Sequence, residues 1–202
     1  MSRKPAPRPR RSAARSAPAK ATLRVVAGSA GGRRIEVPPG SGTRPTSDRV
    51  REATFNAIAS LGAVEGARVF DGFAGSGALG IEALSRGAAH ATFADADPQA
   101  VAVVERNLRA LDLAGSATVL ARPAERALGE RAPFDLVLLD PPYAYEGWPA
   151  LLAEVVASLA PGGVVVIESD RQVVLPDGLV GVRSKAYGGT VVQFAAAAGA
   201  PT

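Results

Sequence analysis

The chain has 202 residues, of which 47% are hydrophobic, and its 23 Lys and Arg against 19 Asp and Glu give a net charge of +4. This length and apolar content suit one folded domain with a sizeable core. The absence of cysteine excludes disulfides and thiolate metal sites, and no membrane-spanning run or signal peptide is seen, so we expect a cytoplasmic protein without a metal.

The positive charge is concentrated near the N-terminus. Residues 1–20 hold seven Lys and Arg and no acid, and residues 1–60 have a net charge of +10, so the remainder is acidic. We expect residues 1–20 to form a disordered basic tail that attracts nucleic acid nonspecifically. A leader without a role and a transit peptide are the alternatives, although four prolines oppose the amphipathic helix of a transit peptide.

Residues 21–62 are predicted to form a β-hairpin followed by a helix. The segments "LRVVAG" and "RRIEVP" flank "SAGG", whose glycines supply turn conformations. Residues 46–62 begin with capping residues, carry apolar positions at helical spacing and stop at Gly62. Phe55 in this helix is expected to be a core residue.

From residue 63 to residue 198, strands alternate with helices. Five strands are predicted at 67–71, 91–95, 117–121, 134–140 and 163–169, separated by helices near 77–86, 98–111, 123–129 and 148–160. Two more strands, 179–187 and 190–196, are joined by Gly188 and Gly189 as a hairpin. The pattern predicts a Rossmann-like α/β fold, with a mostly parallel seven-stranded sheet that ends in an antiparallel hairpin.

The first strand of this alternation ends in a glycine-rich turn. Asp71 is followed by "GFAGSGALG", which lets the backbone approach a ligand closely at the N-terminus of a helix. Asp95 ends the next strand, where a carboxylate can bind ribose hydroxyls. The combination predicts a site for an adenosyl cofactor. A glycine-rich turn without a ligand is the alternative, because the glycine spacing alone is a weak signal.

The strand at 134–140 ends in "DPPY". The Asp140 carboxylate and the Pro141 carbonyl could each accept one N–H of an exocyclic nucleobase amine and direct its lone pair at an electrophilic methyl group. The two prolines stiffen this corner, and Tyr143 could stack on the base. The motif therefore favours methyl transfer to a nucleobase amine, and an ordinary strand-ending turn with an Asp cap is the alternative.

The order of these motifs resembles that of class I amino-methyltransferases that use S-adenosylmethionine. Over residues 23–194, "RVVAGSAGGRRIEVP", "GTRPTSDRVREATFN", "DGFAGSGALGIEALSRGA", "LDPPY" and "YGGT" are similar to the bacterial RsmD-type family. The resemblance implies that residues 63–198 are a methyltransferase domain that methylates guanine N2 in 16S rRNA, within a small ribosomal subunit or an assembly intermediate. No heptad or unexplained apolar stripe is present, so we expect a monomer.

The resemblance also assigns roles to residues. The cofactor would be held by Asp71, Gly72, Phe73, Ala74, Gly75, Ser76, Gly77 and Asp95. The target amine would be held by Asp140, Pro141, Pro142 and Tyr143. Contacts to RNA phosphates would come from Arg33, Arg34, Arg44, Arg49 and Arg51. A solvated face with weak ion pairs is the alternative for these arginines. Because Pro123 cannot donate a backbone hydrogen bond, the Ala124 N–H or a side chain is expected to serve the adenine.

Other functions remain open. An adenine-N6 methyltransferase acting on DNA or RNA would use the same amine clamp. An NAD-dependent oxidoreductase would use the glycine turn but leave "DPPY" without a role. A noncatalytic RNA-binding assembly factor would need neither. Tyr145 or Trp148 could line the base pocket, and for Trp148 we expect a packing role.

Overall fold

The computed structural model describes residues 22–39 and 48–199, so the predicted basic tail and Arg44 lie outside the described residues. The chain begins with the hairpin β1 (Thr22–Arg24) and β2 (Arg34–Glu36), followed by α1 (Asp48–Ser60). The next elements are β3 (Arg68–Gly72), α2 (Ala78–Ser85), β4 (His90–Asp95), α3 (Pro98–Ala110), the 3-10 turn η1 (Ala114–Ser116), β5 (Ala117–Ala121) and α4 (Ala124–Arg131). The last are β6 (Phe134–Leu139), α5 (Trp148–Ser158), β7 (Leu159–Ser169), β8 (Leu179–Tyr187) and β9 (Thr190–Ala197).

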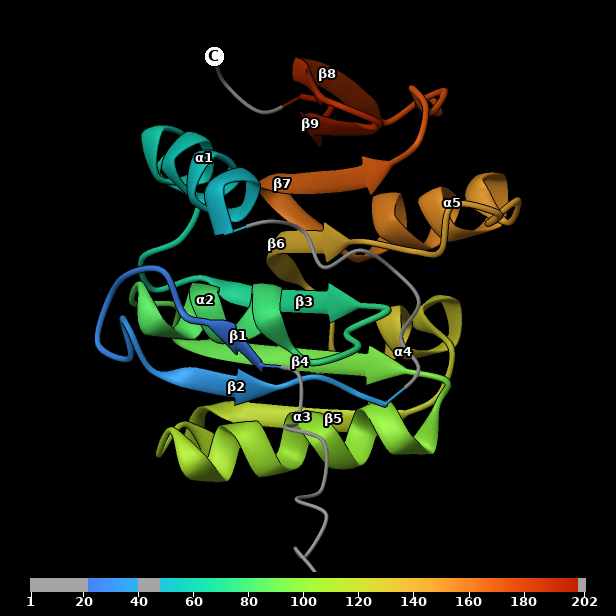
Figure 1. Ribbon diagram of the computed structural model, residues 1–202. Helices are drawn as coiled ribbons and strands as arrows, with labels where there is room; N and C mark the ends of the chain where they lie inside the picture. Colours follow the sequence, from blue (N-terminus) through green and yellow to red (C-terminus); the bar gives the residue numbers. More distant parts are fainter. Residues whose placement is uncertain (1–21, 40–47, 200–202) are drawn as a thin grey trace, which may run out of the picture.

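The seven strands from β3 to β9 form one sheet in the order β5-β4-β3-β6-β7-β9-β8 (Figure 1). Strands β3 to β7 pair in parallel, whereas β9 runs antiparallel to both β7 and β8. The predicted mostly parallel sheet with a C-terminal antiparallel hairpin is therefore confirmed. Strand β9 is inserted between β7 and β8, which leaves β8 at an edge.

One strand starts earlier than the sequence pattern predicts. Strand β7 begins at Leu159 rather than at residue 163. Leu159 pairs with Phe134, and the next paired residues are Val164 and Leu136, so the strand is irregular across Pro161 and Gly162. Such an irregularity absorbs extra residues without breaking the pairing, and an apolar pattern does not reveal it.

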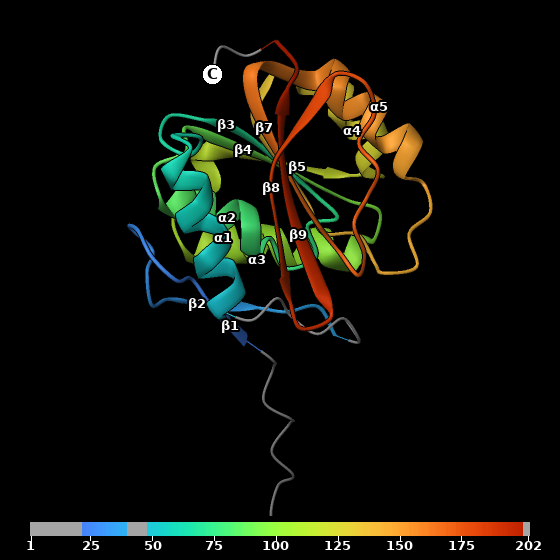
Figure 2. The ribbon, with the colours of Figure 1, turned by 90° about the horizontal axis from the view of Figure 1, so that it is seen from above.

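Helices cover both faces of the sheet. Successive residues of a strand point to opposite faces, so each face has an apolar surface that packs against helices. Val69 of β3 belongs to the core that packs against α1, α2, α3 and the N-terminal hairpin, whereas Phe70 belongs to the core under α4 and α5. Figure 2 shows these two groups of helices on opposite sides of the sheet. The result is a three-layer α/β arrangement.

The N-terminal hairpin and α1 are part of this layered structure. Val25 and Ile35 of the hairpin segment and Phe55 and Ile58 of α1 are all buried in the first core. The core position expected for Phe55 is thus confirmed. In the part of the chain that the structure describes, no helix has the length and apolar character required to cross a membrane.

Candidate active site

Three carboxylates of the predicted site lie at the carboxyl ends of neighbouring parallel strands. Asp71 is the penultimate residue of β3, Asp95 is the last residue of β4, and Asp140 follows the last residue of β6. Because β3 pairs in parallel with both β4 and β6, the carboxyl ends of all three strands lie side by side. In open α/β sheets this edge is where ligands bind.

The loop between β3 and α2 is fixed to the end of β4. The backbone N–H of Ala74 donates to the Ala94 carbonyl at 3.1 Å, and the N–H of Gly75 donates to Asp95 Oδ2 at 2.8 Å. The loop takes left-handed backbone conformations at Phe73 (φ 61°) and Gly75 (φ 55°). For Phe73, a side chain in this region is costly, and such residues concentrate at ligand sites.

Asp71 is buried and faces α2. Its Oδ2 accepts a 2.8 Å hydrogen bond from the N–H of Gly80 in the first turn of that helix. Burial raises the pKa of Asp71 to about 8; the Gly80 hydrogen bond opposes this rise and the nearby Asp95 charge adds to it. Gly80 must be glycine because an added Cβ would stand 2.4 Å from Phe93 Cε1. The absence of a side chain at Gly80 therefore lets α2 lie close enough to the sheet for the Gly80 N–H to reach Asp71.

These residues fit an adenosyl cofactor. Asp95 Oδ1 accepts from the Asp97 N–H at 2.9 Å, and each carboxylate oxygen still has lone-pair capacity for ribose hydroxyls. Beside Gly75 the space is open, since an added Cβ would meet nothing closer than the Phe73 carbonyl oxygen at 3.9 Å. The N-terminus of α2 at Gly77 has no side-chain cap. The Asp95 carboxylate, which can accept from hydroxyls, thus lies near the accessible backbone at Gly75 and the N-terminus of α2.

The predicted adenine contact lies at the start of α4. Pro123 is the N-cap of this helix and Ala124, which is buried, is its first residue. The first amides of a helix have no partner within it, so the position of Ala124 is compatible with its predicted role. Arg122 pairs with Glu130 of the same segment.

The "DPPY" corner follows β6 directly. Pro141 is buried, Asp140 is half-buried, and Pro142 and Tyr143 are exposed. The Pro142 carbonyl accepts the N–H of Tyr145 at 2.8 Å, which closes a tight turn. The phenol oxygen of Tyr143 lies 2.7 Å from Thr190 Oγ1 at the start of β9. The four predicted amine-binding residues thus form a compact turn beside the strand end.

Tyr145 connects this turn to the glycine loop. Its ring packs edge-on against Phe73 and against Trp148, with centroid distances of 5.2 Å for both pairs. Its hydroxyl donates to Glu125 of α4, and burial together with the Glu125 carboxylate raises the pKa of Tyr145. Trp148 is buried, as expected for a packing residue. The predicted cofactor loop and the predicted amine clamp therefore share one aromatic contact, which the sequence pattern did not reveal.

The predicted RNA-binding arginines have different surroundings. Arg34 on β2 and Arg49 on α1 are exposed. Arg33 is also exposed, but its guanidinium donates to the Leu111 carbonyl at 3.2 Å and to the Ala110 carbonyl, at the end of α3. Cations suit this position because the helix dipole is negative there.

Arg51 does not lie on the predicted RNA surface. Only 1% of the residue is exposed, and its guanidinium donates to the Arg24 carbonyl and to Asp48 Oδ1 at 2.9 Å. The prediction of a phosphate contact by Arg51 is wrong, because its charge is enclosed between α1, β1 and α2. It serves instead to dock the N-terminal elements.

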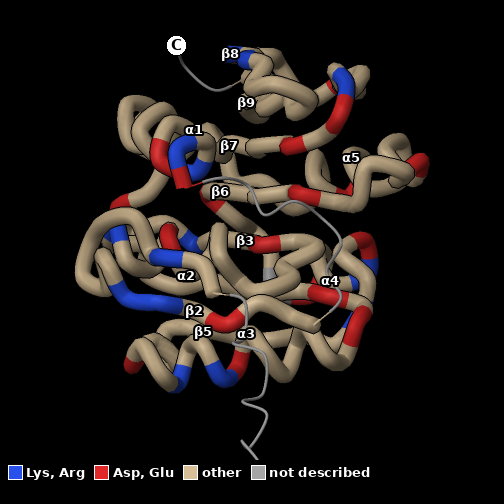
Figure 3. Tube along the Cα trace, viewed as in Figure 1, with Lys and Arg blue, Asp and Glu red and all other residues tan. Residues whose placement is uncertain are grey.

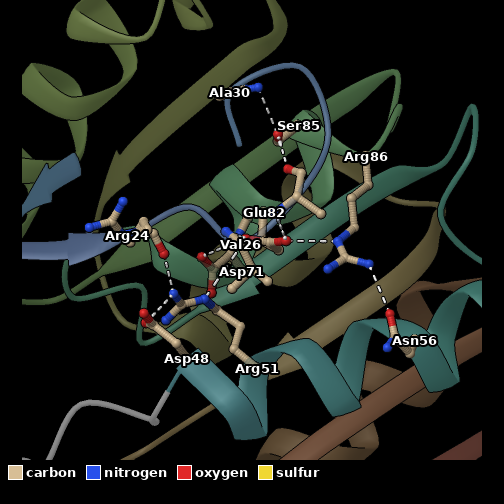
Figure 4. Close-up of polar contacts among 12 residues, drawn as sticks. Arg24, Val26, Ala30, Asp48, Arg51, Asn56, Asp71, Glu82, Ser85 and Arg86 are labelled. Carbon is tan, nitrogen blue, oxygen red and sulfur yellow. Dashed lines mark hydrogen bonds and ion pairs between the residues drawn. The ribbon is translucent and has the colours of Figure 1, made fainter. Parts of the chain in front are cut away.

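Arg51 belongs to a buried polar cluster centred on Glu82 of α2 (Figure 4). Glu82 accepts from the backbone N–H groups of Val26 at 2.7 Å and Ala27 at 3.1 Å, and from Arg86 Nε at 2.7 Å. Arg51 Nε lies 3.9 Å from Glu82 Oε2. One carboxylate thus links the N-terminal hairpin, α1 and the helix that begins at the glycine loop.

The sequence is similar to a known family and to named relatives over most of its length. Residues 23–196 match the model of a family described as "Conserved hypothetical protein 95". A Bacillus subtilis protein named "Putative rRNA methyltransferase YlbH" is 43% identical over 181 residues, covering 85% of this chain and 97% of the relative. "Ribosomal RNA small subunit methyltransferase D" of Escherichia coli strain K12 is 38% identical over 161 residues, covering 76% and 78%.

Solved structures show the same fold. The structure described as "Putative methyltransferase yhhF from Escherichia coli" has a TM-score of 0.78 and 33% identity, and the match covers 88% of this chain and 98% of that one. A Thermus thermophilus 16S rRNA guanine-N2 methyltransferase in complex with AdoMet and guanosine has a TM-score of 0.64 at 24% identity, with 88% of this chain and 50% of that chain covered. At that identity the second likeness concerns the fold alone.

Proposed function

Because the chain belongs to the conserved hypothetical protein 95 family, together with the rRNA methyltransferases it resembles, we propose that it methylates the exocyclic N2 amine of a guanine in 16S rRNA. It is an rRNA methyltransferase that depends on S-adenosylmethionine. The observation that supports transfer to a nucleobase amine is the position of the "DPPY" turn, which is joined to the glycine loop through the Phe73–Tyr145 contact. The choice of guanine rests on the resemblance to the RsmD-type family.

The cofactor site is the loop between β3 and α2 together with the end of β4. We assign the ribose hydroxyls to Asp95, the backbone approach to residues 72–77, and an adenine ring nitrogen to the Ala124 N–H, which would donate to it. When bound, S-adenosylmethionine supplies an electrophilic methyl group. Asp71 keeps α2 in place through its 2.8 Å bond from Gly80, which also fixes where the N-terminus of this helix meets the loop.

The amine clamp consists of two acceptors. The Asp140 carboxylate and the Pro141 carbonyl would each accept one N–H of the guanine N2 amine, which turns the nitrogen lone pair toward the methyl donor. They also stabilise the positive charge that develops on this nitrogen. Buried Pro141 and half-buried Asp140 are held before substrate arrives, since the turn is closed by the Pro142–Tyr145 hydrogen bond. No strong general base is required, because the amine N–H becomes acidic only after the methyl group has been transferred, and its proton can then leave to water.

We assign Tyr143 to stack on the base. The residue is 48% exposed, and stacking on an aromatic ring is a common way for proteins to hold an unpaired base. The target guanine must be flipped out of its helix, or already unpaired, to reach Asp140. Lys and Arg residues occur on the N-terminal hairpin and on α1, among other places (Figure 3). Arg34 and Arg49 among them are exposed, and we assign RNA phosphates to these two.

An adenine-N6 methyltransferase is the second candidate, because the same two acceptors would bind that amine. The names of the relatives favour rRNA as the substrate. Transfer of labelled methyl from S-adenosylmethionine to small ribosomal subunits and to naked 16S rRNA, followed by nucleoside analysis, separates the candidates. N2-methylguanosine is the expected product, and N6-methyladenosine would refute the guanine proposal.

A further inference from the structure

Two residues that lie well after the "DPPY" turn in the sequence contact this turn, which carries the amine clamp. Arg171 lies in the loop after β7, and Thr190 is the first residue of β9. Both contact the turn, and the strands β7 and β9 are neighbours in the sheet. Neither residue belongs to the predicted cofactor site, the amine clamp or the RNA contacts.

Arg171 contacts the backbone of the turn. Its Nη1 donates to the Tyr143 carbonyl at 3.4 Å, and its Nη2 donates to the Tyr145 carbonyl at 3.2 Å. Asp170 Oδ1 accepts from the same Nη1 at 2.9 Å, which orients the guanidinium. A guanidinium has its donors in one rigid plane, so it fixes two carbonyls relative to each other. A lysine ammonium, which is a point charge on a flexible chain, does not.

Thr190 contacts the Tyr143 side chain of the turn. Its Oγ1 lies 2.7 Å from the phenol oxygen of Tyr143, the end of the ring that is farthest from the backbone. The position of Thr190 is itself set by the tight hairpin in which Thr190 pairs with Tyr187 across Gly188 and Gly189. Because the Tyr143 ring is half exposed, this hydrogen bond restrains an orientation that packing alone leaves free.

We propose that Arg171 and Thr190 are positioning residues for methyl transfer, which hold the "DPPY" turn and the Tyr143 ring in the orientation that receives the base. This inference rests on the proposed function. Half of the Arg171 side chain is exposed, and exposed polar contacts contribute little to the free energy of unfolding. Loss of these contacts should therefore lower the rate of transfer while the protein keeps its thermal stability.

The Thr190 contact is tested with variants that remove one hydrogen bond. Thr190→Val keeps the shape and deletes the hydroxyl, Tyr143→Phe deletes the other partner, and Thr190→Ser keeps a hydroxyl. We expect kcat with rRNA to fall about 2- to 12-fold in Thr190→Val, the range for one hydrogen bond, and to recover in Thr190→Ser. The double variant should be no slower than either single variant. Fully additive losses, or no loss in Thr190→Val, would overturn the role of Thr190.

The Arg171 contact is tested with Arg171→Lys, which keeps the charge and loses the planar fork. Arg109→Lys is the matched control, since Arg109 is an exposed arginine on α3 that forms an ion pair with its helix neighbour Glu105. Arg171→Lys should lower kcat several-fold with an unchanged dissociation constant for S-adenosylmethionine and an unchanged melting temperature. Equal kcat values in Arg171→Lys and Arg109→Lys would overturn the role of Arg171.

A second measurement separates this inference from the proposed function. Hydrogen–deuterium exchange of the peptide that covers residues 143–148 reports the order of the turn in the free protein, whether or not the correct RNA has been supplied. We expect faster exchange in Arg171→Lys and Thr190→Val than in Arg109→Lys. Unchanged exchange in an active enzyme would refute the positioning role, whereas faster exchange in a protein that methylates no rRNA would refute the proposed function alone.

Discussion

The Gly75 backbone N–H donates a 2.8 Å hydrogen bond to the Asp95 carboxylate, so the glycine loop after β3 is tied to the end of β4. A single carboxylate therefore shapes the loop and offers further acceptor capacity to a ligand. Asp97, two residues later, has a different task, because its Oδ1 accepts the Gln99 N–H at 2.8 Å and caps α3.

This relationship predicts that Asp95→Ala weakens binding of S-adenosylmethionine by about 10- to 100-fold, the loss of hydrogen bonds to a charged group. Asp97→Ala is the matched control. It should cost about 1 kcal/mol of stability through the lost cap and leave the dissociation constant nearly unchanged. Calorimetric titration with the cofactor measures the dissociation constants of the two variants. Equal weakening of cofactor binding in both would contradict the assignment.

Asp71 predicts a pH dependence of folding stability. Its pKa is about 8 in the folded protein, raised by burial from an ordinary value of 3.8. The folded state then holds the proton more tightly than the unfolded state. The stabilisation from this group is complete below about pH 4 and is lost as the pH rises through about 8, with a slope on the order of 1 kcal/mol per pH unit.

Urea unfolding of the cofactor-free protein between pH 5 and pH 8.5 tests this slope. Asp71→Asn keeps an acceptor for the Gly80 N–H but cannot ionise. The stability difference between parent and Asp71→Asn should shift in favour of Asn as the pH rises. Parallel stability curves would show that the Asp71 carboxyl does not titrate in this range.

Substitutions of Arg49 and Arg51, which are two residues apart on α1, are predicted to have opposite effects on folding stability and on RNA binding. Arg51→Ala should destabilise the fold by about 3 kcal/mol, the low end of the range for a broken buried pair, because Glu82 keeps Arg86 and two backbone amides. Arg49→Ala should change stability by less than about 0.5 kcal/mol.

RNA affinity should show the reverse order. Arg49→Ala is expected to weaken binding of rRNA at low salt and to reduce the slope of log K against log salt by about 1. Chemical unfolding and filter binding over a salt series measure the two effects. A stable Arg51→Ala protein would contradict the buried docking role, and an unchanged salt slope in Arg49→Ala would remove Arg49 from the RNA surface.

The sequence predicts the sheet well because each buried strand is a short apolar run bounded by turn residues. The strands of the main sheet other than β8 follow from this pattern, whereas the mostly exposed β8 follows from the Gly188–Gly189 turn that joins it to β9. The glycine loop and the carboxylates Asp71, Asp95 and Asp140 follow too, since parallel strands bring their carboxyl ends to one edge.

The prediction for Arg51 is wrong because its charge favours an exposed position, whereas its spacing along α1 places it on the buried face. The buried side of α1 holds Arg51, Thr54, Phe55, Ala57 and Ile58. The spacing of Arg51 to Thr54, Phe55 and Ile58 is that of one helical face, so the signal for a buried arginine was present. Its partner Glu82 lies far along the chain, and no local pattern pairs the two.

The contacts that hold the "DPPY" turn were beyond local sequence reasoning. Thr190, Arg171 and Tyr143 come together only because β9 is inserted beside β7 and the loop after β7 returns to the turn. The Phe73–Tyr145 contact likewise depends on side-chain directions in two loops. Strand order and loop path, which local residue patterns leave undetermined, decide these neighbours.

The most direct test of the central claim is transfer of labelled methyl from S-adenosylmethionine to unmodified small ribosomal subunits, with Asp140→Ala beside the parent protein. We expect N2-methylguanosine in the 16S rRNA from the parent and a loss of rate of about 100-fold or more in Asp140→Ala, with cofactor affinity unchanged. An equal rate of N2-methylguanosine formation in parent and Asp140→Ala would contradict this claim.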